Sequence, residues 1–212
     1  MKKYEILSKV EREKIVAIIR VKNEEQAERG LDALLNGGLS CVELTLTTPY
    51  AHSIIEKLSK RYEGTELALG AGSVLDAESA RIAILSGAKY LVTPTFSADV
   101  VRLANRYGVP VFSGVATATE ALAALESGVD VVKLFPATSY PFSIIKDLKA
   151  PMPNLEVMPV GGVNLSNIGE WIKAGAFGCG VGGSLFDGLK EGNYAKITET
   201  AKLFKKAVAE AK

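Results

Sequence analysis

Short apolar runs alternate with helical stretches along nearly the whole chain, and this alternation limits the fold more than any other feature. The sequence contains eight apolar runs, at residues 15–20, 40–46, 66–70, 90–93, 109–112, 129–134, 155–159 and 178–181. Helical patterns follow them near residues 24–36, 50–62, 76–86, 98–107, 118–127, 142–148, 166–174 and 194–212. A further helix is predicted at about residues 3–12. Strands that alternate with helices are typical of α/β proteins with a parallel sheet.

The number of strand–helix units distinguishes between the two main kinds of parallel sheet. Eight units of about 25 residues each favour a closed (β/α)8 TIM barrel with an N-terminal helix. An open, doubly wound sheet usually has fewer strands than this. It stays the alternative, because one miscounted strand would be enough to favour it. Since the chain has 212 residues and is 48% hydrophobic, we expect residues 1–212 to form a single barrel domain.

Charge and hydropathy argue against two classes of partner. A net charge of +1 without a basic run is not typical of a nucleic-acid-binding protein. No apolar run approaches the length of a membrane span, and the first residues lack the apolar core of a signal peptide. We therefore expect a cytoplasmic protein that acts on a small molecule, with neither a membrane nor a nucleic-acid partner.

Cysteine and histidine are too few to suggest a metal centre. Cys41 and Cys179 each lie in an apolar context, which indicates small buried side chains rather than a disulfide. His52 is the single histidine, and its place in a helical stretch favours a surface or packing role. The sequence therefore predicts no zinc or transition-metal site and no cofactor, although magnesium held by carboxylates stays open.

Lys133 lies inside the apolar run Val131–Leu134, which otherwise resembles a fully buried strand. A charged side chain survives there only if it is paired or if it gives up its proton. A lysine with a lowered pKa attacks ketones and forms a Schiff base. The alternative is a strand-end lysine that extends its amine to water. Pro136 marks the carboxyl end of this strand, where barrel enzymes carry their chemistry, and this favours the nucleophile.

Residues 41–47 alternate between aliphatic and polar side chains, which is the period of a strand with one face against helices. Glu43, Thr45 and Thr47 are then predicted to point into the barrel, as is Lys133 on the sixth strand. The second and sixth strands lie opposite each other in a barrel of eight, so Glu43 and Lys133 can share a pocket. Such a pair suits acid–base chemistry, although a purely structural buried ion pair is the alternative.

Glycine pairs follow the seventh and eighth strands, where barrels commonly bind a phosphate through backbone N–H groups. The residues concerned are Gly161, Gly162, Gly182, Gly183 and Ser184. Arg20 ends the first strand, and its guanidinium suits a carboxylate or phosphate, although a surface role is equally compatible with the sequence. Residues 70–73 form a further glycine turn after the third strand, which alone is weak support for a site.

Taken together, these residues resemble the class I aldolases that cleave 2-keto-3-deoxy-6-phosphogluconate and 4-hydroxy-2-oxoglutarate. The resemblance extends from Ile15 to about Phe186. The motifs that carry it are Val42-Glu43-Leu44-Thr45, Gly70-Ala71-Gly72-Ser73-Val74, Val132-Lys133-Leu134-Phe135-Pro136-Ala137, Pro159-Val160-Gly161-Gly162-Val163 and Val181-Gly182-Gly183-Ser184.

The resemblance implies a role for each site residue. Lys133 would form the Schiff base with a pyruvate unit and Glu43 would move protons, without a metal. Ser73 and Thr47 would lie near the pyruvate carboxylate, and the glycine loops with Ser184 would hold the phosphate. Pro94, Phe135 and Val160 complete the expected substrate-binding residues. The products would be pyruvate and glyceraldehyde 3-phosphate, or glyoxylate, and the protein would be a homotrimer.

The chain departs from the family pattern at positions that concern the substrate. Thr47 stands where many members have an arginine that binds the carboxylate. Either Arg20 or backbone groups would then take that role, or the affinity for the carboxylate would be lower. Val160 stands where gluconate-type members have threonine, and galactonate-type members have valine. Ser113 and Ala118 replace prolines near the fifth strand. Other classes stay open, namely a phosphate-binding epimerase or thiamin phosphate synthase, and a sugar-phosphate-binding protein without catalysis.

Overall fold

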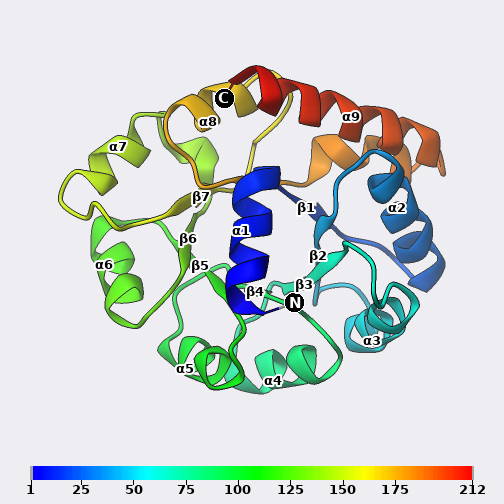
Figure 1. Cartoon of the computed structure of the whole chain (residues 1–212), viewed down its shortest axis with the longest axis horizontal. Helices are drawn as coiled ribbons and strands as arrows, with labels where there is room; N and C mark the ends of the chain where they lie inside the picture. Colours follow the sequence, from blue (N-terminus) through cyan, green and yellow to red (C-terminus); the bar gives the residue numbers. More distant parts are fainter. Residues whose placement is uncertain (1, 212) are drawn as a thin grey trace.

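The computed structural model describes residues 2–211 and shows eight parallel strands that form one barrel (Figure 1). The strand order is β7-β6-β5-β4-β3-β2-β1-β8, and a bridge between Val160 and Gly180 joins the two outer strands. The predicted (β/α)8 barrel is therefore confirmed. The strands are β1 (Ile15–Ile19), β2 (Cys41–Thr45), β3 (Ala68–Gly72), β4 (Leu91–Val92), β5 (Val111–Val115), β6 (Val131–Leu134), β7 (Val157–Pro159) and β8 (Cys179–Val181).

Helices surround the barrel, and one of them closes its amino-terminal end. The surrounding elements are α2 (Glu24–Asn36), α3 (Ala51–Arg61), α4 (Ala77–Leu85), α5 (Ala98–Tyr107), α6 (Ala118–Glu126), α7 (Ile144–Lys149), α8 (Ile168–Lys173) and α9 (Tyr194–Ala211), with the 3-10 helices η1 (Ala137–Ser139) and η2 (Gly183–Leu189). Helix α1 (Lys3–Glu13) crosses the middle of the barrel in Figure 1. Its Ile6 and Val10 pack into the barrel interior, so α1 leaves the carboxyl-terminal rim free for a site.

Successive residues of each strand point alternately into two apolar cores. Val42, Leu44, Val132 and Leu134 belong to the core between the barrel and its helices. Alternate residues point into the barrel, where they form the second core: Val16, Ile18, Cys41, Ala68, Tyr90, Val92, Phe112, Val131, Met158, Val160 and Phe177, together with Ile6 and Val10 of α1. The predicted period of two is confirmed, and it directs the side chains between Val42 and Leu44, and between Val132 and Leu134, into the barrel.

Strand β3 ends two residues later than the sequence predicts. The predicted turn at residues 70–73 lies mostly inside the strand, because Gly70 and Gly72 are inward positions rather than turn positions. A Cβ built on Gly70 would lie 2.3 Å from the Tyr90 ring, and one on Gly72 would lie 1.7 Å from Glu43 Oε1. These glycines therefore make room for large neighbours inside the barrel.

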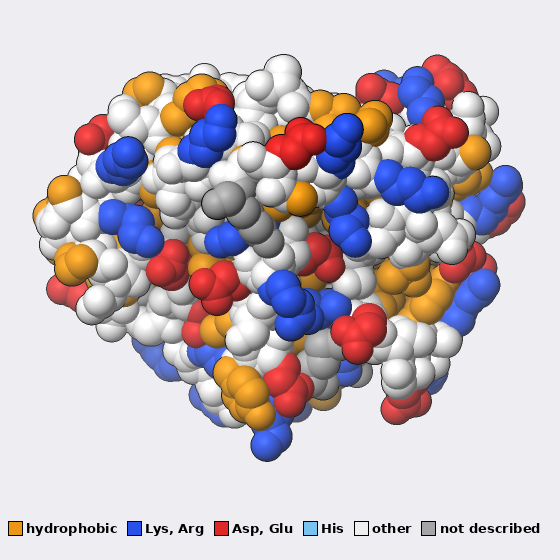
Figure 2. Space-filling view, turned by 45° about the horizontal axis from the view of Figure 1, so that its top comes forward, with side chains coloured by type: hydrophobic (Ala, Val, Ile, Leu, Met, Phe, Trp, Pro, Cys, Tyr) orange, Lys and Arg blue, Asp and Glu red, His pale blue; other side chains and the backbone are white. Residues whose placement is uncertain are grey.

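The polar side chains of the surface mix both charges. Lys and Arg side chains alternate with Asp and Glu over the face in Figure 2. Several of them form ion pairs on exposed helices, such as Arg29 with Glu25 and Lys60 with Glu56. Across residues 2–211, no helix combines the length and the apolar character that crossing a membrane requires.

Candidate active site

Lys133 lies on β6 with its side chain inside the barrel, and only 6% of the residue is exposed. Burial lowers the pKa of Lys133, the Glu43 carboxylate raises it in part, and the Arg20 guanidinium lowers it further. The Nζ atom lies 5.0 Å from the centre of the Phe135 ring. An amine in this environment loses its proton more readily than a surface lysine, and the neutral amine is the nucleophilic form.

Glu43 lies on β2 and is 1% exposed. Burial raises the pKa of its carboxyl, while the charges of Lys133 and Arg20 lower it in part. Its Oε2 atom has no hydrogen-bond partner in the described part of the chain. A carboxyl with a raised pKa holds its proton to higher pH than an exposed glutamate does, which suits it to proton transfer with a reacting group.

Lys133 and Glu43 are close enough for each to shift the pKa of the other. Within residues 2–211, however, they form no ion pair at 4.0 Å or less. Lys133 and Glu43 therefore do not form the buried ion pair that a purely structural role would need. Two partly neutralised groups that face the same interior can act on one small molecule between them.

A cavity of about 290 Å³ opens at the carboxyl-terminal rim, where the loops after β1, β6, β7 and β8 converge. Its lining includes all five predicted phosphate residues together with three other predicted ones. These are Gly161, Gly162, Gly182, Gly183, Ser184, Arg20, Phe135 and Val160. Gly161 and Gly162 have φ values of 97° and 72°, which only glycine adopts easily, so this loop needs both of them.

Asn164 also lines the cavity, although the sequence analysis does not single it out. Its Nδ2 donates to the Gly162 carbonyl at 3.1 Å, and Asn167 Nδ2 donates to the same carbonyl at 2.9 Å. Asn167 Oδ1 in turn accepts from the Asn164 backbone N–H at 2.9 Å. The spacing of two asparagines after a glycine pair is a sequence signal for such a turn. Val163, Ile18 and Gly180 complete the lining, and only barrel closure brings Ile18 and Gly180 there.

The remaining predicted residues lie at the same rim but outside this cavity's lining. Ser73 directly follows β3 with a left-handed φ of 57°, which is uncommon for a residue with a side chain. Thr47 is exposed, and its hydroxyl lies 2.9 Å from that of Thr45. Pro94 is half-buried against Gly114, whose Cβ would lie 2.1 Å from the Pro94 carbonyl. Gly114 pairs with Lys133, so Pro94 approaches the lysine strand.

Other predictions concern residues outside the site. His52 is exposed on α3, and Cys41 and Cys179 are buried free thiols, as expected. Within residues 2–211, no three His, Cys, Asp or Glu side chains are grouped so that they could hold a metal ion.

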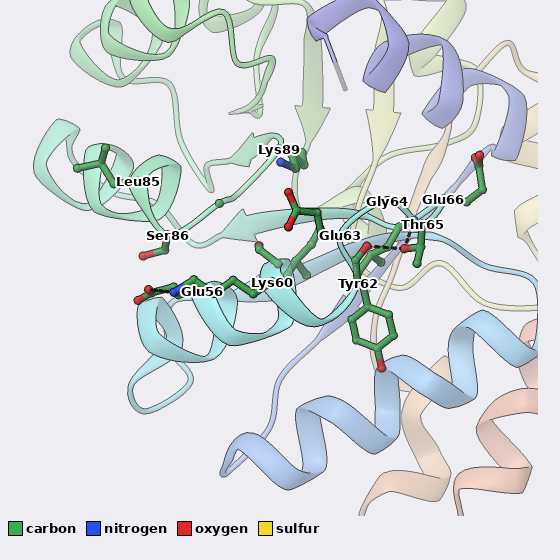
Figure 3. Close-up of a pocket in the computed structure, with 14 residues that line it drawn as sticks. Glu56, Lys60, Tyr62, Glu63, Gly64, Thr65, Glu66, Leu85, Ser86 and Lys89 are labelled. Carbon is green, nitrogen blue, oxygen red and sulfur yellow. Dashed lines mark hydrogen bonds and ion pairs between the residues drawn. The ribbon is translucent and has the colours of Figure 1, made fainter.

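A larger hollow of about 590 Å³ lies at the opposite rim, among the loops that precede β3 and β4 (Figure 3). Its wall carries both charges, and Glu56 pairs with Lys60 along it. The Tyr62 hydroxyl points away from the hollow towards α2, where it donates to Asp32. None of the predicted site residues lines this hollow. It lies at the amino-terminal ends of the strands, where the residues of a barrel contribute to stability rather than to catalysis.

A barrel that encloses a readily deprotonated lysine beside a carboxyl, under a glycine-lined rim cavity, has the parts of a class I aldolase. Such enzymes are carbon–carbon lyases that work through a lysine Schiff base, and this chain is one of them. Residues 6–200 match the family model described as KDPG and KHG aldolase. The chain belongs to that family, as its sequence motifs suggest.

Named relatives cover most of the chain. It is 36% identical over 198 residues to 2-dehydro-3-deoxy-6-phosphogalactonate aldolase of Escherichia coli K12, which covers 93% of this chain and 95% of the relative. It is 35% identical to 2-dehydro-3-deoxy-phosphogluconate aldolase of Treponema pallidum, with 79% of each chain covered. Among solved structures, a native KDPGal structure matches with a TM-score of 0.86 and 35% identity, over 93% of this chain and 95% of that one.

Proposed function

We propose that this enzyme cleaves a 2-keto-3-deoxy-6-phospho sugar acid to pyruvate and glyceraldehyde 3-phosphate, with Lys133 as the Schiff-base lysine. The observation that carries this assignment is the proximity of Lys133 and Glu43 inside the barrel, where burial favours the neutral form of each. Phe135 lines the glycine-lined cavity at the rim, and its ring centre lies 5.0 Å from Lys133 Nζ. A neutral amine and a carboxyl that holds a proton are the reactants that carbinolamine formation and dehydration need.

The reaction begins when the Lys133 amine adds to the keto carbon of the substrate. The resulting carbinolamine loses water, which Glu43 assists by donating a proton to the leaving oxygen, and an iminium ion forms. The Glu43 carboxylate then accepts the proton of the hydroxyl on carbon 4, the bond between carbons 3 and 4 breaks, and its electrons move into the iminium to give an enamine. Glyceraldehyde 3-phosphate leaves. Protonation of enamine carbon 3 and hydrolysis release pyruvate and the free lysine.

The two anionic ends of the substrate are assigned to different sides of the lysine. Backbone N–H groups at Gly161, Gly162, Gly182 and Gly183, with the Ser184 hydroxyl, hold the phosphate. Arg20 lines the same cavity and adds a permanent charge. Ser73 and Thr47 bind the pyruvate carboxylate on the other side, and Pro94 and Phe135 form apolar walls near the amine.

Val160 supports the galactonate-derived substrate over its gluconate-derived epimer. It is buried in the cavity lining, and galactonate-type members of the family have valine at this position. The Escherichia coli relative is named for that substrate. The alternative substrates are 4-hydroxy-2-oxoglutarate and the gluconate epimer, for which the Treponema pallidum relative is named. A phosphorylated sugar acid carries several negative charges and does not cross membranes freely, which supports a cytoplasmic enzyme.

An exposed apolar stripe supports assembly into a homotrimer. Ile82 and Leu85 are three residues apart on α4 and are 52% and 66% exposed, and Leu75 before the helix is 66% exposed. Tyr50 and Ile82 line one shallow hollow beside this stripe. Large apolar side chains gathered on one face are typical of a protein interface.

Reductive trapping tests the assignment of the lysine. The enzyme is incubated with pyruvate and borohydride, digested, and searched for the peptide that carries the added mass. We expect the adduct on Lys133, and we expect Lys133→Ala to lose both the adduct and aldol cleavage while keeping its circular dichroism spectrum. Lys9→Met is the matched control, because Lys9 is also buried but pairs with Glu66 away from the site.

An adduct on another lysine, or turnover by Lys133→Ala, would contradict the mechanism. If the unmodified enzyme forms no adduct at all, a phosphate-binding barrel of another class becomes the better hypothesis. Inhibition by a chelator would then support a metal-dependent epimerase.

A further inference from the structure

Two buried oxygen atoms inside the barrel lack a hydrogen-bond partner. Across residues 2–211, the unpartnered buried side-chain oxygens are Glu43 Oε2, the Tyr90 hydroxyl and Ser59 Oγ. Ser59 belongs to α3, outside the barrel. The other two share the barrel interior. Leaving a buried polar atom unpaired is costly, so a pair of such atoms in one enclosure needs a common explanation.

Tyr90 directly precedes β4 and is fully buried. Its ring packs beside Phe112, with 5.3 Å between the ring centres. Phenylalanine would fill this apolar position equally well, because the packing uses only the ring. The hydroxyl therefore has no packing purpose, and burying it without a partner destabilises the fold.

The inner face of β3 brings Tyr90 and Glu43 together. The Tyr90 ring covers Gly70, and the Glu43 carboxyl covers Gly72. These glycines are consecutive inward positions of one strand, about 7 Å apart. The ring carbon that bears the hydroxyl is among the atoms nearest to Gly70, at 2.5 Å from its Cβ position. The hydroxyl thus extends beside the strand segment that supports the carboxyl.

The groups that face Tyr90 keep its hydroxyl protonated. Burial raises the pKa of Tyr90, and the charges of Cys41, Glu43 and Glu13 raise it further, in that order. Glu13 is otherwise occupied, since it accepts hydrogen bonds from the backbone N–H groups of Ser40 and Cys41. The Tyr90 hydroxyl is therefore a hydrogen-bond donor, and the Glu43 carboxyl is a stronger acceptor for it than the neighbouring Cys41 sulfur.

The groups that face Glu43 are Lys133 of β6 and Arg20 after β1, and neither hydrogen-bonds its Oε2. Both approach from the catalytic rim, whereas Tyr90 lies deeper, at the start of β4. The Tyr90 hydroxyl makes no direct hydrogen bond to Glu43 within residues 2–211. A single enclosed water between them would satisfy both oxygens, because a buried water needs at least two polar partners.

We propose that Tyr90 is a positioning residue, whose hydroxyl donates through one enclosed water to the Glu43 carboxyl and fixes that carboxyl for proton transfer. The inference rests on the proposed function, because it assigns the proton-transfer role to Glu43. A carboxylate held by a donor is stabilised, and its orientation is restricted to one rotamer. Without that donor, the carboxyl holds its proton more tightly and turns more freely.

Tyr90→Phe tests the proposal, because it removes only the hydroxyl. We expect kcat to fall about fivefold to tenfold with KM changed less than about twofold, and the acidic limb of the kcat profile to move up by roughly one pH unit. Infrared titration of the protonated carboxyl band, assigned by its loss in Glu43→Gln, should show the same upward shift. Phe112→Leu is the packing control, and it should lower Tm without moving either profile.

Superimposable pH profiles and infrared titrations for Tyr90→Phe and the unmodified enzyme would overturn the proposal. Equal shifts in Phe112→Leu would also overturn it, since the effect would then come from packing. Borohydride trapping with pyruvate separates this result from the proposed function. If Tyr90→Phe still forms the adduct on Lys133 but its profiles do not shift, only the role of Tyr90 is rejected. If the unmodified enzyme forms no adduct on Lys133, the proposed function itself is rejected.

Discussion

Gly72 lies directly against the Glu43 carboxyl, and a Cβ at Gly72 would lie 1.7 Å from Oε1 and 2.3 Å from the carboxyl carbon. Its φ lies outside the left-handed region, so alanine is compatible with the backbone there. The three heavy atoms nearest to a Cβ at Gly72 all belong to the side chain of Glu43, the proposed proton-transfer group. The inner surface of β3 therefore determines where the Glu43 carboxyl can lie.

Gly72→Ala should displace that carboxyl and lower kcat by about a hundredfold or more, because a shift of about 1 Å in a catalytic group has effects of that size. Steady-state cleavage assays measure the change. Gly169→Ala is the matched control, since Gly169 lies in α8 and its Cβ would contact only the Ala211 side chain at an ordinary 3.7 Å. Full activity in Gly72→Ala would show that Glu43 needs no fixed position.

Arg20→Ala should weaken binding of the phosphorylated substrate. The loss of charge-assisted hydrogen bonds to a phosphate is expected to lower kcat/KM about 10-fold to 100-fold. Cleavage of 4-hydroxy-2-oxoglutarate, which has no phosphate, should change much less. Lys22→Ala, which removes a nearby exposed charge, controls for the general field of the rim. Equal losses for both substrates would place Arg20 at the carboxylate instead.

Val160→Thr should shift preference towards the gluconate-derived substrate. The two side chains have nearly the same shape, so packing against Gly180 and Ile18 is retained while a buried hydroxyl enters the cavity. A hydroxyl there can hydrogen-bond one carbon-4 epimer better than the other, which typically changes selectivity by about tenfold or more. The ratio of kcat/KM for the two epimers measures the shift. An unchanged ratio would assign the choice of epimer to other residues.

Lys133→Met should stabilise the fold as the pH falls below the ordinary lysine pKa of 10.5. Burial lowers the pKa of Lys133 in the folded state, so the unfolded state takes up the proton first and the unmodified fold loses stability as pH decreases. The gain in folding stability of Lys133→Met over the unmodified chain should be small above the ordinary lysine pKa. It should grow as the pH falls towards the pKa of Lys133 in the folded state, and then level off.

A Glu43→Gln background removes the neighbouring carboxyl from this comparison, since its charge affects the pKa of Lys133. Thermal unfolding of the single and double variants between about pH 6 and 11 gives the difference, and each kcal/mol corresponds to about 2–4 °C in a chain of this size. A difference in Tm that does not depend on pH would mean that Lys133 has an ordinary pKa in the fold.

Ile82→Glu combined with Leu85→Glu should convert the proposed trimer into monomers, because burying two carboxylates in an apolar interface is strongly unfavourable. Light scattering after size exclusion gives the mass. Leu203→Glu is the matched control, since Leu203 is equally exposed but lies on α9. A mass that is the same for all variants and the unmodified chain would place the interface elsewhere or exclude assembly.

Local patterns in the chain were enough to predict most of the architecture. The alternation of apolar runs and helices indicated eight units, and the period of two placed Glu43 and Lys133 inside the barrel. Such signals depend on neighbours a few residues apart, so they can be recognised from the sequence alone. The glycine pairs could be assigned to the rim for the same reason, because the order of strands along a barrel follows the order of the chain.

Only the tertiary structure decided which residues surround the reacting groups. Gly72 resembled a turn residue, but it is an inward position of β3 that the Glu43 carboxyl covers. Tyr90 begins one of the apolar runs of the sequence, but only the fold places its ring on Gly70, beside the strand position that the Glu43 carboxyl covers. These relationships join residues 20 to 50 positions apart, and they depend on strand stagger and closure of the barrel, which local sequence patterns do not encode. The chain thus determined the fold and the place of Lys133 and Glu43 inside the barrel, whereas packing across the barrel decided which side chains surround these two groups.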